Sequence, residues 1–201
     1  MKAELSYVSG IGDAPLLGMT IGKALDQAAA LWPDRDALVS ADHGVRWSWQ
    51  QLSERADALA AGFLALGLKR GARIGIWSPN RPEWTLAQLA AAKAGLILVT
   101  INPAYRLNEL EYALVKVGCA ALVTATSFKS SRYVDMINEL APELARSQPG
   151  RLRAARLPKL RTVIQIGGPA SAGMVPFEAV SGLGGMAAHE REVERPPGQA
   201  D

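Results

Sequence analysis

Hydrophobic positions near the start of the chain predict a helix, a hairpin and a second helix. Apolar residues recur at helical spacing over residues 21–32. Short apolar runs on either side of Asp42-His43-Gly44 are typical of two strands joined by a turn. Ser48 and Gln51 match a capping box, and the apolar stripe that follows over residues 52–66 predicts a helix starting at this box.

From residue 73 onward, continuous apolar runs alternate with amphipathic ones. The continuous runs are typical of strands covered on both faces: 73–77, 96–100, 120–124 and 162–166. The amphipathic runs between them predict helices: 82–94, 108–117 (with Asn108 and Glu111 as a cap pair) and 131–140. This order predicts strand–helix units with right-handed crossovers. We therefore expect an α/β fold, a mostly parallel sheet with flanking helices.

Two segments depart from this pattern. Arg146–Arg161 carries six basic residues and is predicted to be a solvated connector, with contact to an anionic surface as the alternative. Residues 181–201 are first glycine-rich and then charged and proline-rich, without core-forming periodicity. We expect residues 1–180 to fold and residues 181–201 to form a disordered tail.

Composition narrows the classes of function. With 49% hydrophobic and 20% charged residues among 201, the chain is typical of a soluble globular protein. A net charge of +3 is too small to favour nucleic acid, and one cysteine cannot form an internal disulfide. No apolar run reaches the length of a membrane span, and the first 18 residues lack a secretory pattern. We therefore predict a cytoplasmic location.

The titratable residues form no pattern that indicates catalysis. His43 falls in a predicted turn and His189 in the predicted tail, and neither has a second ligand at metal spacing. Cys119 opens an apolar strand, as a buried hydrophobic residue would. Glu109 and Glu111 lie at a helix start, where capping is the better interpretation. We predict no catalytic, cofactor-binding or metal-ligating residue in this chain.

Ligands of open α/β sheets bind beyond the carboxyl ends of the strands. Three segments follow predicted strands and would meet there: Ser78–Arg81, Asn102–Arg106 and Gly167–Gly168. Asn80, Asn102 and Arg106 are polar enough to bind a ligand. Helix capping and turn formation are the more ordinary interpretation of each.

Three segments in the same order resemble a known family. Trp47–Leu52 is similar to the first core motif of the adenylate-forming (AMP-binding) enzymes, Ala91–Pro103 to the second, and Gly67–Ile76 to the link between them. Further segments resemble fatty acyl-CoA synthetases of the medium-chain acyl-CoA ligase type: Ser6–Gly10, Pro15–Gly18, Ile76–Asn80, Asn102–Arg106, Glu111–Leu114, Val117–Cys119 and Leu157–Arg161. The resemblance extends from about residue 5 to about residue 180.

The resemblance implies an acid–thiol ligase that uses ATP, Mg and CoA to convert a fatty acid to acyl-CoA, AMP and pyrophosphate. The family's Ser/Thr/Gly-rich phosphate loop ending in Pro-Lys-Gly is absent, as are its later nucleotide motifs and its C-terminal lysine domain. Residues 1–180 are therefore expected to be an incomplete N-terminal part of the large domain, inactive alone and without cofactors of its own. No catalytic residue of the family can be placed on this sequence.

Two further expectations concern partners. The alternative to an inactive part of an enzyme is a non-catalytic binding or interaction protein derived from the same fold. The predicted strand at 162–166 would lack its neighbour, which leaves Val163–Ile166 as an exposed sheet edge. We therefore expect self-association through this edge, and no binding of nucleic acid.

Overall fold

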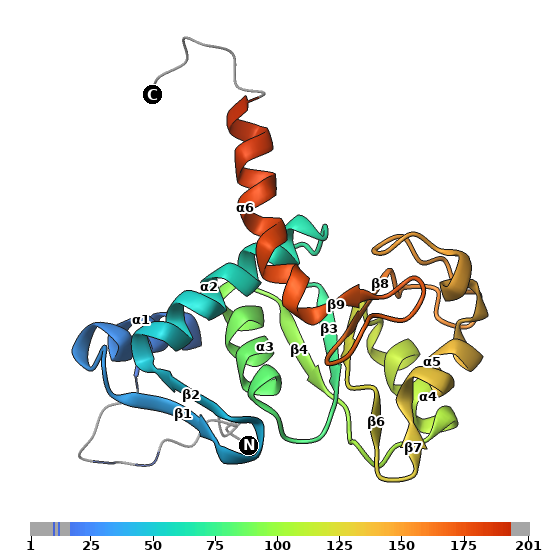
Figure 1. Cartoon of the computed structure of the whole chain (residues 1–201), viewed down its shortest axis with the longest axis horizontal. Coiled ribbons are helices and arrows are strands. Elements are labelled where there is room, and N and C mark those ends of the chain that lie inside the picture. The colour runs from blue at the N-terminus through green and yellow to red at the C-terminus, as the bar shows by residue number, and fades with distance from the viewer. Residues whose placement is uncertain (1–9, 11, 13–16, 194–201) are drawn as a thin grey trace, which may run out of the picture.

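The computed structural model describes residues 10, 12 and 17–193, with side chains up to residue 185. A hairpin and one helix lie at one end, a sheet lies in the middle, and two helices lie at the other end (Figure 1). The helices are α1 (Ile21–Leu31), α2 (Trp49–Ala65), α3 (Pro82–Lys93), α4 (Leu107–Val117), α5 (Tyr133–Leu140) and α6 (Phe177–Val193). The strands are β1 (Asp36–Ser40), β2 (Val45–Ser48), β3 (Arg73–Trp77), β4 (Ile97–Thr100), β5 (Ala121–Thr124), β6 (Ser127–Phe128), β7 (Ser131–Arg132), β8 (Thr162–Gln165) and β9 (Val175–Pro176).

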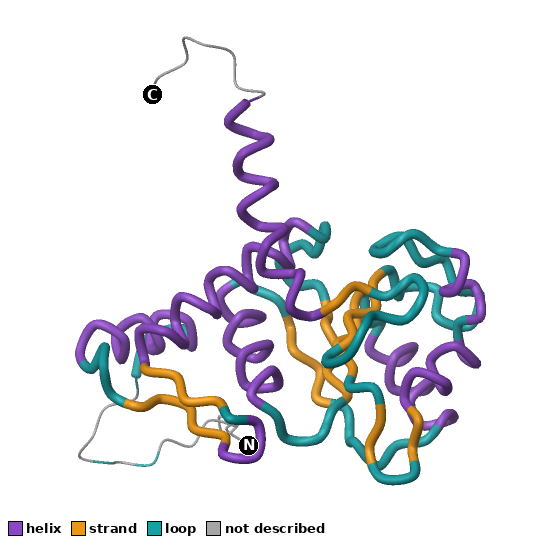
Figure 2. Tube along the Cα trace, in the orientation of Figure 1, coloured by secondary structure: helices purple, strands orange, loops and turns teal. Residues whose placement is uncertain are grey.

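The central sheet has the strand order β4-β3-β5-β8-β9, and every pair in it is parallel. Side chains that alternate along β5 enter two separate cores. Val123 joins the core beneath α1, α2, α3 and α6, whereas Leu122 joins the core formed with α4 and α5. The predicted α/β fold with a mostly parallel sheet and flanking helices is therefore confirmed (Figure 2).

Both helix starts with predicted caps are capped, but one cap is displaced. At α2, Ser48 N donates to Gln51 Oε1 at 3.0 Å and Gln51 N donates to Ser48 Oγ at 3.3 Å, as the capping box predicts. At α4, the backbone N–H of Arg106 donates to Glu109 Oε2 at 3.1 Å. The helix therefore begins earlier than the predicted cap pair of Asn108 and Glu111, and Glu109 does the capping.

The basic connector, Arg146–Arg161, packs against the second core, which is the one formed with α4 and α5. Leu152, Ala154, Leu157 and Leu160 are all at most 4% exposed, and they cover the side of that core. Their spacing is irregular, so no helical or strand periodicity reveals them. The connector is also held by charge, because the guanidinium of Arg156 donates to both carboxylate oxygens of Glu111, at 2.8 and 2.6 Å. The prediction of a solvated connector is therefore wrong for its apolar residues.

The sheet edge predicted to be bare is covered. Ile164 pairs with Val175 and Gln165 with Pro176, because the short strand β9 lies beside β8. Val163, Ile164 and Ile166 have no exposed surface. The expected exposed edge at Val163–Ile166 is therefore wrong. A two-residue strand is too short to give a periodic signal, so β9 could not be predicted.

Helix α6 continues past residue 180, where we expected a disordered tail, and runs to Val193. Glycines allow its first turns to pack closely on α2. A Cβ atom on Gly62 would lie 2.0 Å from the carbonyl oxygen of Val180, and one on Gly184 would lie 2.5 Å from the Cβ of Ala61. The glycine-rich stretch thus forms a helix contact instead of a flexible linker. Residues 194–201 of the expected tail lie outside the described residues, as do segments 6–9 and 15–16 of the resemblance.

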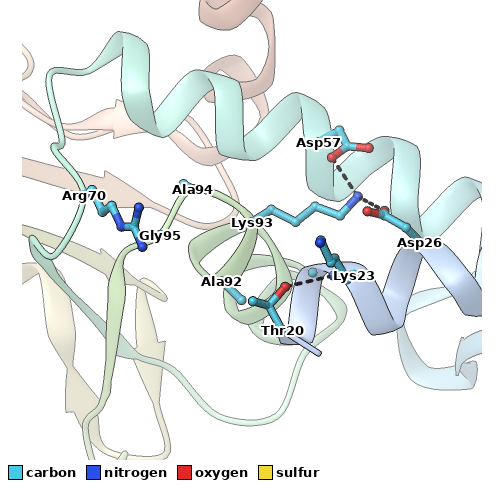
Figure 3. A pocket seen from close by; sticks show the side chains of 10 residues that line it. Thr20, Lys23, Asp26, Asp57, Arg70, Ala92, Lys93, Ala94 and Gly95 are labelled. Atoms are coloured by element: carbon cyan, nitrogen blue, oxygen red, sulfur yellow. Dashed lines mark hydrogen bonds and ion pairs between the residues drawn. The ribbon is translucent and has the colours of Figure 1, made fainter. Parts of the chain in front are cut away.

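An ion cluster ties together α1, α2 and α3 (Figure 3). The Nζ of Lys93 donates to Asp26 Oδ1 at 2.6 Å, to Asp57 Oδ1 at 2.7 Å and to Ser53 Oγ at 2.9 Å. The lysine side chain is only 8% exposed, whereas both carboxylates remain largely in solvent. The ammonium is therefore buried with all three of its protons donated.

The cluster shifts the pKa of its members. The hydrogen bond from Lys93 holds the pKa of Asp26 below its usual value of 3.8. For Lys93, burial favours the neutral amine, but the hydrogen bonds and the charges of Asp26 and Asp57 together outweigh burial and raise its pKa above 10.5. The Asp26 contribution to stability is therefore present above pH 3.8 and is lost as the pH falls through the folded-state pKa. The Lys93 contribution is present below pH 10.5 and is lost as the pH rises through its folded-state pKa.

Gly62→Ala tests the contact between α2 and α6. The new methyl group overlaps the backbone of Val180, so the helices must separate. We expect the free energy of unfolding to fall by about 1–3 kcal/mol, and Tm by about 2–12 °C for a chain of this size. Gly182→Ala is the matched control, because its methyl group meets no atom within 4 Å and replaces a glycine inside a helix. Equal Tm values for the two variants would contradict the close packing.

Lys93→Met tests the ion cluster. Urea unfolding at pH 7 should show a loss of about 1–3 kcal/mol, since three charge-assisted hydrogen bonds disappear. The variant should also lose less stability than the parent chain between pH 7 and pH 3, because the pKa of Asp26 returns toward its usual value. Lys23→Met removes a neighbouring exposed lysine and serves as the control. If the Lys23→Met control loses as much stability, removal of a positive charge explains the effect, and the specific role of the Lys93 hydrogen bonds is contradicted.

Candidate ligand-binding loops at the carboxyl end of the sheet

The predicted loop segments meet at one edge of the sheet. Ser78–Arg81 follows β3, Asn102–Arg106 follows β4 and Gly167–Gly168 follows β8. A Cβ atom placed on Gly167 would lie 3.8 Å from Nη2 of Arg81, so the first and third loops are neighbours. The Nη1 of Arg106 donates to Ser131 Oγ at 2.7 Å, which ties the second loop to the β6–β7 hairpin. The expected gathering of loops is thus present in the fold.

An aromatic pair holds the main chain of the Asn102–Arg106 loop. The rings of Trp77 and Tyr133 stack with centroids 3.6 Å apart and planes 16° apart. The Trp77 Nε1–H donates to the carbonyl of Asn102 at 3.2 Å, and the Tyr133 hydroxyl donates to the carbonyl of Pro103. Burial raises the pKa of Tyr133 to about 12, so this hydroxyl keeps its proton. The loop conformation is therefore set by two buried donors.

The sequence pattern did not predict this aromatic pair, nor the role of Gln165 in holding the loop that follows β8. Gln165 is buried and its Nε2 donates to the carbonyls of Gly167 and Pro169, at 3.0 and 2.9 Å. Its Oε1 accepts from the N–H of Ser171 at 3.0 Å. A glutamine at the end of an apolar strand was the available signal, since a buried amide must find partners. Tyr133 gave no such signal, because its partners lie far away in sequence.

Among the predicted polar candidates, Asn102 and Arg106 make hydrogen bonds within the fold. Asn102 Oδ1 accepts from the N–H of Ala104 at 2.9 Å, which is the turn-forming interpretation. Asn80 is exposed. Arg81 donates to both oxygens of Glu83 at 3.2 Å. Burial favours protonated Glu83, but the hydrogen bond and charge of Arg81 together with a backbone hydrogen bond and the charge of His43 outweigh it, and the pKa of Glu83 is lowered. The Glu83 carboxylate is therefore held charged rather than poised to exchange a proton.

The histidines and the cysteine belong to different segments of the fold. His43 Nδ1 shares a hydrogen bond with Ser40 Oγ at 2.9 Å, and His189 belongs to α6. Cys119 is buried, which raises the pKa of its thiol to about 11 and keeps it protonated. Within residues 10, 12 and 17–185, whose side chains the structure describes, no three His, Cys, Asp or Glu side chains gather to hold a metal ion. Among the same residues, no helix is both long and apolar enough to span a membrane.

Two grooves lie outside these loops. One, of about 540 Å³, surrounds the Lys93 cluster, with Lys23 and Arg70 at its rim (Figure 3). The other, of about 290 Å³, runs between β2, α2, α3 and α6 and is lined by Trp47, Arg55 and Phe177 among others. Lys93 Nζ donates to the carboxylates of both Asp26 and Asp57, so the first groove is centred on an ion cluster that joins three helices.

Curated relatives match most of this chain. A mouse protein named medium-chain acyl-CoA ligase ACSF2, mitochondrial, is 47% identical over 165 residues, which are 82% of this chain and 27% of that protein. This chain therefore spans about a quarter of the length of the relatives it matches. Proteins of that name from mouse, rat and macaque are named as mitochondrial, so the prediction of a cytoplasmic location is contradicted. The absence of a secretory pattern could not distinguish these two compartments.

Solved structures and a family profile give the same assignment. An acetoacetyl-CoA synthetase from Streptomyces lividans matches with TM-score 0.67 and 26% identity, covering 81% of this chain and 25% of that one. The N-terminal domain of FACL13 from Mycobacterium tuberculosis matches with TM-score 0.61 and 25% identity, covering 73% and 34%. The profile of the AMP-binding enzyme family matches residues 25–196, which extends beyond residue 180. The chain therefore belongs to the AMP-binding enzyme family, and the resemblance seen in its sequence is confirmed.

Proposed function

We propose that this chain is the N-terminal part of an ATP-dependent acyl-CoA ligase that acts on medium-chain fatty acids. In the complete enzyme, the acid, ATP and CoA would give acyl-CoA, AMP and pyrophosphate. The single observation that carries the proposal is the 47% identity to the mouse medium-chain acyl-CoA ligase over most of this chain. The order of the motifs at Trp47–Leu52 and Ala91–Pro103 supports it.

The contribution of this part is structural. Lys93, in the second motif, joins three helices, and the same motif ends in the Asn102–Pro103 turn that Trp77 and Tyr133 hold. Ser48 and Gln51, in the first motif, cap α2. Trp77 and Tyr133 hold the main chain of the Asn102–Arg106 loop, so we propose that this part orients loops for a site completed by the rest of the ligase.

ATP, Mg and CoA would then be bound mainly by residues outside this chain. The residues present do not fit the phosphates and metal, because no Ser/Thr/Gly-rich loop ending in Pro-Lys-Gly occurs among the 201 residues. Stabilising a transferring phosphoryl group needs donors and a cation aimed at the developing charge. In the carboxyl-end loops, the guanidinium groups of Arg81 and Arg106 already donate to Glu83 and Ser131. We propose that the chain is inactive alone.

An ATP–pyrophosphate exchange assay with octanoic acid tests this inactivity. This chain alone should give the exchange rate of a blank without protein, because the donors for the phosphates are missing. The complete mouse ligase serves as the positive control. Exchange above the blank that scales with the concentration of this chain would falsify the proposal.

We further propose that this chain self-associates through strand β4, and not through the covered edge at Val163–Ile166. Strand β4 is an outer strand of the sheet, and its residue Ile97 is 48% exposed. An unpaired edge with an apolar side chain favours pairing with a second copy. Light scattering after size exclusion at high micromolar concentration should give a mass above 21.4 kDa.

Ile97→Lys should shift that mass toward the monomer, since charge at an edge opposes pairing. Leu31→Lys is the control, because Leu31 is also exposed (58%) but belongs to α1. A sharp monomer peak for the parent chain, or an equal effect of both variants, would rule out association through β4.

A further inference from the structure

The amino ends of the parallel strands form an edge that lies opposite the candidate ligand-binding loops. Four segments lead into the four longer strands of the sheet: 66–72 into β3, 94–96 into β4, 118–120 into β5 and 148–161 into β8. None of these segments contains Asp or Glu, although the chain has 19 such residues. The four segments, which we call the amino edge together with Arg73, therefore bring no negative charge to this end of the sheet.

Main-chain hydrogen bonds join the segments of the amino edge. The N–H of Ala120 donates to the carbonyl of Arg73, and the N–H of Arg161 donates to the carbonyl of Ala120, both at 2.8 Å. The N–H of Leu152 donates to the carbonyl of Arg161 at 2.9 Å, so two arms of the connector also lie together. Figure 1 shows the loop after α2 and the connector at the same end of the strands. Residues distant in sequence thus share one surface.

This surface carries an excess of positive charge. Its exposed basic residues are Lys69, Arg70, Arg73, Arg151, Arg153, Lys159 and Arg161. Among the side chains that the structure describes, no carboxylate forms an ion pair with any of these seven. Glu111 and Glu143 flank the connector, but Arg156 donates to Glu111 at 2.6 and 2.8 Å and the N–H of Ala155 donates to Glu143 at 3.0 Å. The seven cations are therefore available to a partner.

The packing of the connector holds its cations on the outside. Exposed Arg151 and Arg153 flank buried Leu152, and exposed Lys159 precedes buried Leu160. The leucines fix the main chain on the second core, so the entropy of ordering this segment is already lost in the folded chain. Binding through these side chains therefore costs less than binding through a flexible basic tail.

Large apolar side chains are exposed beside the charges. Leu64, in the last turn of α2, is 49% exposed, and its carbonyl accepts from Gly67 in the loop that carries Lys69. Val117, at the end of α4, is 37% exposed. It precedes Gly118, where an added Cβ atom would lie 3.9 Å from Cγ of Lys159. Basic and apolar side chains together are typical of a surface that lies on lipid, since nucleic acid phosphates gain nothing from apolar contacts.

We propose that the amino edge binds the surface of a bilayer that contains anionic phospholipids. The basic side chains meet the headgroup phosphates, and Leu64 and Val117 enter the boundary between headgroups and acyl chains. Charge complementarity selects an anionic surface, and the apolar side chains select lipid over nucleic acid. This surface goes beyond the proposed ligase function, because it lies at the opposite end of the strands from the candidate loops.

Co-sedimentation of this chain with vesicles tests the proposal. One set of vesicles contains phosphatidylcholine alone, and the other contains equal parts of phosphatidylcholine and phosphatidylglycerol. We expect at least about tenfold tighter binding to the second set, because each basic side chain near an anionic surface contributes about fivefold in affinity. Raising NaCl from about 0.1 M to about 1 M should release the chain, since the Debye length shrinks from about 10 Å to about 3 Å.

The double variant Arg151→Gln/Arg153→Gln should bind the anionic vesicles about 25-fold more weakly, since two cations leave the surface. Arg35→Gln/Lys129→Gln is the matched control and should bind like the parent chain. It removes the same net charge from two exposed residues that lie outside the amino edge. Circular dichroism of each variant confirms that it folds.

A second pair of variants tests the apolar contribution. Leu64→Gln should weaken binding to the anionic vesicles about fivefold, because a half-exposed leucine can no longer be buried in lipid. Leu31→Gln changes an exposed leucine of α1 and should leave binding unchanged.

Three outcomes would overturn the proposal. The first is no binding to anionic vesicles at the lower salt concentration. The second is an equal loss in the two double variants, which would mean that net charge alone acts. The third is tighter binding to a DNA duplex or to polyglutamate than to anionic vesicles, which would assign the edge to nucleic acid or to an acidic protein. Binding is measured without ATP or fatty acid, so its result is independent of the exchange assay.

Discussion

The fold depends on one constraint, which is that the central parallel strands must be covered on both faces. Alternate side chains of β5 and β8 enter different cores: Val123 and Ile164 the first, Leu122 and Val163 the second. Their main-chain donors and acceptors are used within the sheet, so only apolar neighbours can cover them. Helices on one face and α4, α5 and the connector on the other supply that cover. A segment as basic as Arg146–Arg161 is therefore drawn against the protein through its leucines.

The same constraint places polar groups at the carboxyl edge. Trp77 ends β3 inside the second core and can satisfy its indole N–H only at a nearby carbonyl, which is that of Asn102. Tyr133 stacks on it and donates to the next carbonyl, of Pro103. Gln165 ends β8 in the same way and folds the following loop around its amide. Loop geometry at this edge is thus a consequence of how buried polar groups find partners.

The arrangement explains why motifs of an enzyme family can be structural. Lys93 uses its charge to join α1, α2 and α3, at distances of 2.6 and 2.7 Å from two carboxylates. Ser48 and Gln51 start the helix on which Ser53 and Asp57 meet that lysine. The two motifs therefore support each other within one layer. The groove beside Arg55 lies between β2, α2, α3 and α6.

The sequence by itself determined the parallel α/β architecture, the capping box of α2 and the turn role of Asn102, because these depend on local periodicity and on hydrogen bonds between neighbours. It also determined the family, through motifs in a fixed order. Only the tertiary structure decided the rest: the pairing of β9 with β8, the packing of the first turns of α6 on α2, and the stack of Trp77 on Tyr133. Each of these rests on contacts between residues distant in sequence, such as Gly62 against Val180, which leave no periodic trace in either partner.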